Sequence, residues 1–479
     1  MQKIKNPLSI FFLIINDVVV LFFSFLLAYT LRSYILVPII PSFKTQPPLP
    51  LMTILRLGFF YGAFIIVVVM AYYKLYTRRR SFWEETKYLI ESVTISFILI
   101  TVIVFISRQY IYFSRVIIIF SWLSSLLFLP LSRLATKNIL FRLSLWRKKV
   151  LILGTNISAP LVTQGIKNNP ILGYEVAGLL SKNKPTSKKN LSGYRILGTL
   201  QDVKKISRLL NVQDIIIALP DLSQGELIKV IESCEPFART IRIVPNIGSL
   251  FTLGVKVENL GDILSLSLSR NLTKPLNTFL KHIVEYIMVL ILSLLFLPFF
   301  LLIALAIKFD SWGPVLFIQK RLGKGGKIFS IYKFRSMYED EASRLQAYLK
   351  NNPQEKKKWE MYQKIRENDP RVTRVGKFFR KWSIDELPQL INILKGDMSL
   401  VGPRPYLPRE KQKMGNSYNI ISRVKPGMTG FWQVRGRNLL PFKQRLLLDE
   451  HYIRNWSLWL DFVILLKTAK VLTKREGAF

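Results

Sequence analysis

Two adjacent carboxylates stand in the segment 383–390, which reads Ser-Ile-Asp-Glu-Leu-Pro-Gln-Leu. An aspartate can attack a phosphoryl group to form an acyl phosphate, which divides one difficult transfer into two easier steps. A second carboxylate can bind Mg²⁺, whose charge would neutralise a diphosphate and its leaving nucleotide. Because neighbouring side chains on an α-helix diverge by about 100°, Asp385 could face the phosphorus while Glu386 holds the ion. The pair therefore indicates phosphoryl transfer.

The same segment also fits a purely structural role. Ser383 and Glu386 have the spacing of a capping box, and Asp385 would complement the helix dipole in the first turn. The local pattern alone favours this cap, although one helix start can hold both a cap and a catalytic acid.

Basic residues stand on both sides of the acidic pair. Lys333 and Arg335 follow a glycine-rich basic turn at 323–327, and Arg404 lies between two prolines that limit its backbone freedom. Lysine offers a point charge to phosphate oxygens, and arginine offers a two-pronged donor. The alternatives are contact with lipid head groups for the basic run and an ordinary surface turn around Arg404.

The composition combines two extremes that rarely occur together in a soluble protein. Of the 479 residues, 50% are hydrophobic, yet the formal net charge is +39. Apolar blocks separated by basic stretches are typical of a membrane protein with a large cytoplasmic part. The single cysteine, Cys234, excludes intramolecular disulfides and thiolate metal clusters, and the two histidines exclude a histidine-rich metal site.

Four apolar segments within residues 1–146 predict a four-helix transmembrane bundle. Each approaches the roughly 20 residues that a spanning helix needs. Lysine and arginine are concentrated at the two ends of the bundle and after the second segment, so both ends are expected in the cytoplasm. Asp17 lies inside the first segment, and we expect it to pair with an interfacial arginine rather than to act in function. The segments are about 8–31, 51–73, 88–107 and 116–134.

A fifth apolar segment, about 283–307, has basic residues on both sides. Both flanks are therefore expected in the cytoplasm, which a straight span does not allow. Pro298 removes a helical hydrogen bond near the middle, so we predict a re-entrant helix that enters one leaflet, breaks at Leu297-Pro298 and returns. The alternative is a kinked spanning helix, which would place the rest of the chain outside the cell.

Between residues 147 and 270, short β-rich runs alternate with helical stretches, which predicts a Rossmann-like parallel sheet. Gly154 follows the first run, where a dinucleotide fold carries G-x-G-x-x-G, but the later glycines are missing. We expect a structural or regulatory domain, with nucleotide sensing as the alternative. The whole chain is thus predicted to be a membrane protein of mixed α and α/β class: the bundle (1–146), the Rossmann-like cytoplasmic domain (147–270), and the re-entrant helix with a mainly helical catalytic domain (271–479).

Four long motifs occur here in the order and spacing of a known family. Over about residues 274–479 the chain resembles the bacterial polyprenyl-phosphate sugar-1-phosphate transferases, the monotopic-type phosphoglycosyl transferases. Its complete layout is similar to that of the large members. The motifs are Lys-Phe-Arg-Ser-Met at 333–337, Asp-Glu-Leu-Pro-Gln-Leu at 385–390, Gly-Asp-Met-Ser-Leu-Val-Gly-Pro-Arg-Pro at 396–405 and Pro-Gly-Met-Thr-Gly at 426–430.

The resemblance implies that a hexose 1-phosphate, with galactose expected and glucose as the alternative, passes from a UDP-hexose to undecaprenyl phosphate. Asp385 would form a phosphosugar intermediate with release of UMP, and Glu386 would help to bind Mg²⁺. Phosphate contacts would come from Lys333, Arg335, Arg404 and Arg437, with Gln433 nearby.

The resemblance also implies a place for the protein in the cell. It would be a multi-pass protein of the bacterial inner membrane, surrounded by inner-membrane lipid, with its catalytic domain on the cytoplasmic face. We expect a homodimer and no nucleic-acid partner. The reaction would be the first membrane step of O-antigen, capsule or exopolysaccharide synthesis.

The chain departs from the family pattern at three places. The start of the predicted re-entrant helix reads Lys-His-Ile-Val-Glu at 281–285, where the family usually has Lys-Arg-x-x-Phe-Asp. Leu297 stands where the family usually has serine before the proline, and Arg435 stands where a small or amide residue is common, which could bear on the choice of sugar.

Two rival functions are also considered. One rival is a membrane-bound nucleotide-sugar dehydratase, which would need an intact glycine-rich fingerprint. The other is a basic membrane scaffold, which would tolerate replacement of Asp385 and would not depend on Mg²⁺.

Overall fold

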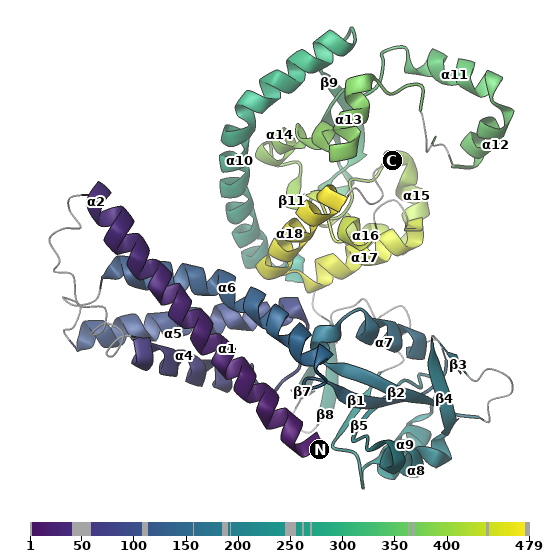
Figure 1. The fold of residues 1–479 in the computed structure, drawn as a ribbon. Helices are drawn as coiled ribbons and strands as arrows, with labels where there is room; N and C mark the ends of the chain where they lie inside the picture. Colours follow the sequence, from purple (N-terminus) through teal and green to yellow (C-terminus); the bar gives the residue numbers. More distant parts are fainter. Residues whose placement is uncertain are drawn as a thin grey trace. The chain divides into compact units, whose positions relative to one another are not determined.

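The computed structural model describes the chain except for residues 1, 41–58, 108–113, 157, 184–189, 192, 245–254, 261–262, 269–270, 363–364, 366–368, 437–439 and 475–479. It contains two compact units, residues 1–247 and 248–479, whose elements are labelled in Figure 1. The predicted boundary between residues 146 and 147 falls inside the first unit. The three-domain division remains a prediction.

Four apolar helices of the first unit pack around one hydrophobic core: α1 (Gln2–Thr30), α4 (Phe60–Tyr72), α5 (Phe82–Ile106) and α6 (Arg115–Arg142). The stretch Pro7–Ile39, α5 and α6 are each long and apolar enough to cross a membrane. The described helix α4 has 13 residues, and residues 51–58 of the predicted second segment lie outside the described part of the chain. Several apolar helices are thus confirmed, and the complete four-span bundle remains a prediction.

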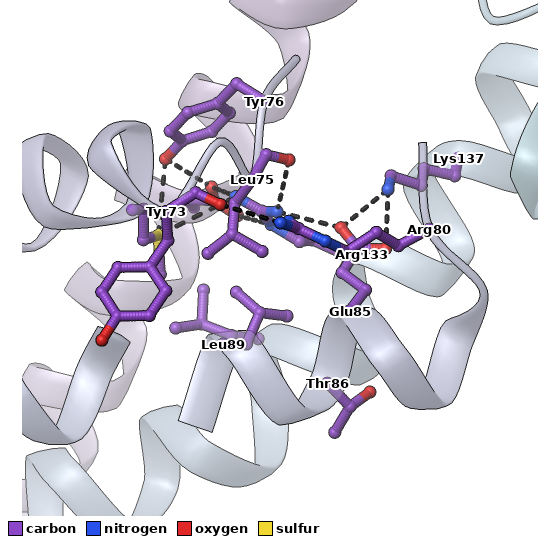
Figure 2. Close-up of polar contacts among 12 residues, drawn as sticks. Tyr73, Leu75, Tyr76, Arg80, Glu85, Thr86, Leu89, Arg133 and Lys137 are labelled. Atoms are coloured by element: carbon purple, nitrogen blue, oxygen red, sulfur yellow. Dashed lines mark hydrogen bonds and ion pairs between the residues drawn. The ribbon is translucent and has the colours of Figure 1, made fainter. Parts of the chain in front are cut away.

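Buried charges join three of these helices (Figure 2). Arg133 of α6 is 1% exposed, and its guanidinium donates to Asp17 Oδ1 at 2.9 Å and to Glu85 Oε1 at 3.0 Å. Lys137 donates to both oxygens of Glu85, and the Tyr76 hydroxyl donates to Asp17 Oδ2 at 2.8 Å. The predicted pairing of Asp17 with an arginine is confirmed, although that arginine is buried inside the bundle. Two acids and two bases are balanced there.

The first unit also contains a six-stranded sheet in the order β3-β4-β2-β1-β5-β6. All neighbouring strands pair in parallel except β3 and β4, which are antiparallel. The predicted parallel sheet is therefore confirmed. Its strands are β1 (Lys148–Leu153), β2 (Tyr174–Ser181), β3 (Asn190–Leu191), β4 (Tyr194–Thr199), β5 (Asp214–Ile217) and β6 (Thr240–Ile243), and the helices around it are α7 (Ser158–Lys167), α8 (Val203–Leu210) and α9 (Gln224–Cys234).

The central strand β1 explains why this segment forms a covered parallel sheet. Val150 and Ile152 pack on the face that α7 covers, whereas Leu151 and Leu153 pack on the face that α8 and α9 cover. Successive side chains of a strand point to opposite faces, so a strand buried on both sides reads as an unbroken apolar run.

The second unit contains a hairpin of β7 (Val255–Leu260) and β8 (Ile263–Leu268), followed by the apolar helix α10 (Pro275–Asp310). The helix has 36 residues, includes Pro298 and is long and apolar enough to cross a membrane. Figure 1 shows it as one curved helix. A proline inside a helix commonly bends it without ending it. The re-entrant path and the break at Pro298 remain predictions.

The rest of the second unit is built mostly from short helices and two small sheets. β9 (Leu316–Leu322) pairs antiparallel with β10 (Ile328–Phe334), and β11 (Ser399–Val401) pairs in parallel with β12 (Gly427–Thr429). The helices are α11 (Glu341–Asn351), α12 (Pro353–Tyr362), α13 (Arg374–Trp382), α14 (Gln389–Leu394), α15 (Lys411–Met414), α16 (Tyr418–Ile421), α17 (Phe442–Asn455) and α18 (Leu458–Lys474).

Candidate active site

A pocket of about 670 Å³ lies in the second unit, between the β9–β10 hairpin, the turn that follows α13, and the loops after β11 and β12. One predicted site residue, Arg437, lies outside the described residues. The structure brings the other predicted residues together on the wall of this pocket: Asp385, Glu386, Lys333, Arg335, Arg404 and Gln433.

The acidic pair lies on a short 3₁₀ turn, Ile384–Glu386, and not on the predicted α-helix. Ser383 ends α13 in the left-handed conformation, with φ of +56°, and makes no side-chain cap hydrogen bond. The predicted capping box is therefore wrong, because Ser383 lies between α13 and the 3₁₀ turn with a left-handed backbone that ends α13, and its side chain does not cap the turn. Side chains in a 3₁₀ helix diverge by about 120° per residue, and both carboxylates still reach the pocket.

The pocket environment changes the acidity of the pair. Burial raises the pKa of Asp385 to about 6, and the adjacent Glu386 charge raises it too, whereas Lys333 and Arg380 lower it. Lys333 Nζ donates to Glu386 Oε1 at 2.9 Å. Lys333 thus neutralises one carboxylate while the other, Asp385, stays mostly ionised at neutral pH. An ionised, partly desolvated carboxylate is suited to nucleophilic attack.

A buried amide places Lys333 opposite the acidic turn. Asn392 of α14 is fully buried, donates to the Ser330 carbonyl at 2.7 Å and accepts from the Tyr332 N–H at 3.0 Å. These bonds join β10 to the helix that follows the acidic turn. Lys333 directly follows Tyr332 on β10, so these bonds also fix the position from which its side chain reaches Glu386.

Arg335, which the motif predicts to contact phosphate, binds backbone carbonyl groups in this structure. Its guanidinium donates to the carbonyls of Ser311 and Trp312, at 2.7 and 2.6 Å, just beyond the end of α10. The side chain is 7% exposed. Both terminal nitrogens therefore join β10 to α10, and a phosphate contact for Arg335 remains a prediction.

Three arginines that were not predicted as site residues also line the pocket: Arg321, Arg371 and Arg380. Arg380 of α13 donates to Ser336 Oγ at 2.8 Å, and its charge lowers the pKa of Asp385. Arg321 of β9 donates to the Pro405 carbonyl at 3.1 Å, and burial lowers its pKa to about 10. Arg380 could have been predicted from the run of basic residues just before the acidic pair. Arg321 could not, because only the folded β9–β10 hairpin brings it to the pocket.

Arg404 follows the point where the end of β11 passes close to the start of β12. A Cβ added to Gly402 would lie 2.7 Å from Gly427 N, so only glycine permits this approach of β11 and β12. The Arg404 guanidinium carbon lies 5.3 Å from the centre of the Trp432 ring, in a cation–π contact. The aromatic ring therefore helps to orient the arginine at the pocket wall.

Gln433 and Arg435 follow on the next turn. Gln433 lines the pocket and uses its Oε1 to accept from the Gly430 N–H at 3.0 Å. Arg435 is exposed, lies 5.2 Å from the centre of the Phe431 ring, and is not among the described residues that line the pocket. A role for Arg435 in the choice of sugar remains a prediction.

The donor set of the pocket fits Mg²⁺ only if a substrate completes it. Within the part of the chain that the structure describes, no group of three or more His, Cys, Asp or Glu side chains could hold a metal ion. Mg²⁺ at phosphoryl-transfer sites commonly takes one or two carboxylates together with phosphate oxygens and waters. Glu386 would supply one carboxylate, and a bound diphosphate and waters would supply the remaining oxygens.

Comparison with known proteins places this pocket in a family context. Residues 276–475 match the family described as bacterial sugar transferase, and residues 72–245 match a family described as CoA-binding domain. The undecaprenyl-phosphate galactose phosphotransferase of Salmonella typhimurium is 34% identical over 411 residues, which cover 84% of this chain and 84% of that protein.

Of two further relatives, one is named for glucose and the other matches less than half of this chain. The UDP-glucose:undecaprenyl-phosphate glucose-1-phosphate transferase of Escherichia coli is 29% identical over 330 residues, or 67% of each chain. The exopolysaccharide production protein ExoY of Sinorhizobium fredii is 40% identical over 194 residues, which cover 40% of this chain and 85% of that protein.

Proposed function

Because this chain belongs to the bacterial sugar transferases, as a polyprenyl-phosphate hexose-1-phosphate transferase, we propose that it transfers a hexose 1-phosphate from a UDP-hexose to undecaprenyl phosphate. Galactose is the proposed sugar, since the galactose enzyme is similar over more of the chain than the glucose enzyme. The observation that carries the proposal is a carboxylate pair facing several cations in one pocket. Membership of an enzyme family sets aside the scaffold hypothesis.

The first step is an attack by an Asp385 carboxylate oxygen on the sugar-linked phosphorus of the UDP-hexose. The bond from this phosphorus to the bridging oxygen breaks, and UMP leaves with that oxygen and its electron pair. The product on the enzyme is an acyl phosphate that carries the sugar. Lys333 and Arg380 lie next to the pair and would stabilise the charge that develops on the phosphoryl oxygens.

The second step transfers the phosphosugar to the lipid. A phosphate oxygen of undecaprenyl phosphate attacks the same phosphorus, and the Asp385 carboxylate leaves. The product is undecaprenyl diphosphate with the sugar attached, and the enzyme returns to its starting state. Arg404 and Arg321 line the pocket wall and would bind phosphate oxygens of the substrates.

A divalent cation would assist the first step. Glu386 would hold Mg²⁺ together with diphosphate oxygens, and the bound ion would neutralise charge on the diphosphate. Since Lys333 now pairs with Glu386 at 2.9 Å, its ammonium group would turn toward the phosphate when the substrate and the ion enter.

The apolar helices and the relatives' names support a membrane setting. We place the protein in the bacterial inner membrane with the catalytic unit on the cytoplasmic face, where UDP-sugars are available. It would act as a homodimer at the first membrane step of O-antigen, capsule or exopolysaccharide synthesis. The re-entrant path of α10 belongs to the same proposal, because it keeps both flanking basic regions in the cytoplasm.

The test is UMP release by the purified protein in the presence of Mg²⁺, undecaprenyl phosphate and each of a panel of UDP-hexoses. Without the lipid, a radiolabelled UDP-hexose should leave its sugar phosphate on the peptide that contains Asp385. Asp385→Asn should lower turnover by about 10³-fold or more, because the amide cannot act as the nucleophile.

A matched control is Asp340→Asn. Asp340 is an exposed carboxylate that pairs with Arg344 on the surface, so this variant should keep full activity. No UMP from any UDP-hexose would contradict the transferase function. Full activity of Asp385→Asn would contradict the covalent intermediate while leaving the overall transfer intact.

A further inference from the structure

A buried carboxyl group that takes no direct part in the proposed chemistry lies behind the pocket. Asp449 of α17 is 0% exposed. Its Oδ2 accepts from the Arg404 backbone N–H at 3.1 Å and from the Tyr406 hydroxyl at 2.8 Å. Its Oδ1 has no hydrogen-bond partner among the described residues.

Such a group is unfavourable for folding by itself. Burial raises the pKa of Asp449 to about 7, although the bonds from Tyr406 and Arg404 oppose that change. A buried polar atom without a partner loses its hydration and gains nothing in return. A hydrophobic side chain at this position would avoid that cost but would leave the Arg404 N–H and the Tyr406 hydroxyl without this acceptor, so the two groups that the carboxyl binds indicate its role.

Asp449 is one of several side chains whose hydrogen bonds hold the backbone of the loop that carries Arg404. Glu285 of α10 accepts from the Val401 N–H at 3.1 Å, and the Tyr452 hydroxyl contacts the Val401 carbonyl oxygen at 3.0 Å. Pro403 and Pro405 have no N–H, so the Arg404 N–H is the one backbone donor within residues 403–405. Asp449 binds that donor.

We propose that Asp449 is a positioning residue for the transfer reaction: it holds the backbone of Arg404 so that the guanidinium points into the pocket. Asp449 does not touch the substrate, and its effect passes through Arg404. The inference rests on the proposed function, in which Arg404 binds substrate phosphate. Displacement of a binding group by about 1 Å can lower activity by about 100-fold, so a backbone anchor can matter to the reaction.

The experiment measures kcat, KM for the UDP-hexose and the melting temperature of the full-length protein. Asp449→Leu removes both hydrogen bonds at similar volume and should lower kcat/KM by about 100-fold. Asp449→Asn keeps an acceptor for Arg404 and should restore most of that activity. If Asp449→Leu fails to fold, Asp449→Ala, which also removes the acceptor, is used in its place, and the same loss of kcat/KM is expected.

A double-mutant cycle separates positioning from a general effect on folding. In an Arg404→Ala background, the same Asp449 substitution should cause little further loss of kcat/KM, although it should change the melting temperature by the same amount in both backgrounds. Equal losses of kcat/KM in the two backgrounds would overturn the proposal.

Tyr406→Phe is the matched control, because it removes the other bond to Asp449 Oδ2 and leaves the Arg404 N–H in place. A small loss of activity is expected. A loss as large as that of Asp449→Leu would assign the effect to the packing of α17 and overturn the inference. If Arg404→Ala alone leaves activity unchanged, the phosphate role of Arg404 fails, which is a separate result.

Discussion

The acidity of Asp385 depends on residues that are far from it in the sequence. Burial and Glu386 raise the pKa of Asp385, and Lys333 and Arg380 lower it. Glu386 and Arg380 are close in the chain, but Lys333 comes from the β9–β10 hairpin. The acidity of this carboxyl is therefore set jointly by the local turn and by a strand that packs against it.

At the residue scale, we predict that activity falls at acid pH. The proposed nucleophile must be ionised, and the pKa of Asp385 is raised to about 6, so kcat/KM should fall progressively below that pH. At pH 5 it should be about tenfold below its value at pH 8, since only about a tenth of the groups would be ionised. The measurement is kcat/KM for UMP release against pH, which reports groups of the free enzyme, and a flat profile from pH 5 to 8 would contradict the assignment.

Lys333→Met should move this acid limb to higher pH, because the lysine charge lowers the pKa of Asp385. It should also reduce the maximal rate, since Lys333 is proposed to contact phosphate. Lys350→Met is the control, because Lys350 is exposed on α11, and its profile should match that of the unmodified protein. A shift to lower pH in Lys333→Met would show that another group controls the profile.

At the element scale, α10 is joined to the catalytic unit by a buried ion network. Lys281 of α10 donates to Glu285 at 2.6 Å and to Asp461 of α18 at 2.7 Å. Asp461 also accepts from the Tyr452 hydroxyl and from the Trp456 indole N–H. Since Glu285 also binds the Val401 N–H, the apolar helix and the Arg404 loop are held by one set of contacts.

Lys281→Met should destabilise the protein by about 3–5 kcal/mol, because it leaves two carboxylates buried without their cation. Burial raises the pKa of Asp461, and Lys281 opposes this, so the variant should have a further raised pKa there. The loss of stability should then be smaller at low pH, where Asp461 is protonated, and larger as the pH rises. Thermal unfolding in detergent at several pH values measures both effects.

The exposed lysine just before α10, Lys274, provides the control. Lys274→Met should leave the melting temperature almost unchanged at every pH. If Lys281→Met behaved in the same way, the network would contribute no stability, and the connection between α10 and the Arg404 loop would have to come from apolar packing.

At the scale of the whole molecule, the chemistry is concentrated in one of the two units. Among the residues that the structure describes, those that line the pocket all lie between 314 and 433, and the relative ExoY matches 40% of this chain but 85% of its own length. The predicted site residues therefore belong to the second unit, whereas the bundle and the parallel sheet belong to the first.

We predict that residues 248–479, expressed in membranes, retain sugar-phosphate transfer at a rate within about tenfold of the full chain, a difference of about 1.4 kcal/mol in the barrier. The measurement is UMP release by membranes that contain equal amounts of each protein, with Asp385→Asn of the shorter chain as the blank. Complete loss of activity in a folded shorter chain would show that the first unit contributes directly to the reaction.

The sequence by itself determined those features whose signals are local. Apolar length predicted the membrane helices, strand–helix alternation predicted the parallel sheet, and the motifs at 385–390 and 396–405 indicated the family. Each of these patterns depends on the order of residue types within a short window, where helix and strand periodicity act. The capping box was also a local inference, yet it was wrong, because the conformation of Ser383 depends on how α13 ends.

Only the tertiary structure decided which side chains meet. It paired Lys333 with Glu386, turned Arg335 toward the end of α10, and brought Arg321 into the pocket. It also buried Asp449 behind Arg404. These pairs are separated by long stretches of chain, and their contact depends on the packing of strands, loops and helices against one another. No short-range pattern in the sequence encodes such packing, and for this reason the site could be located from the sequence while its internal arrangement could not.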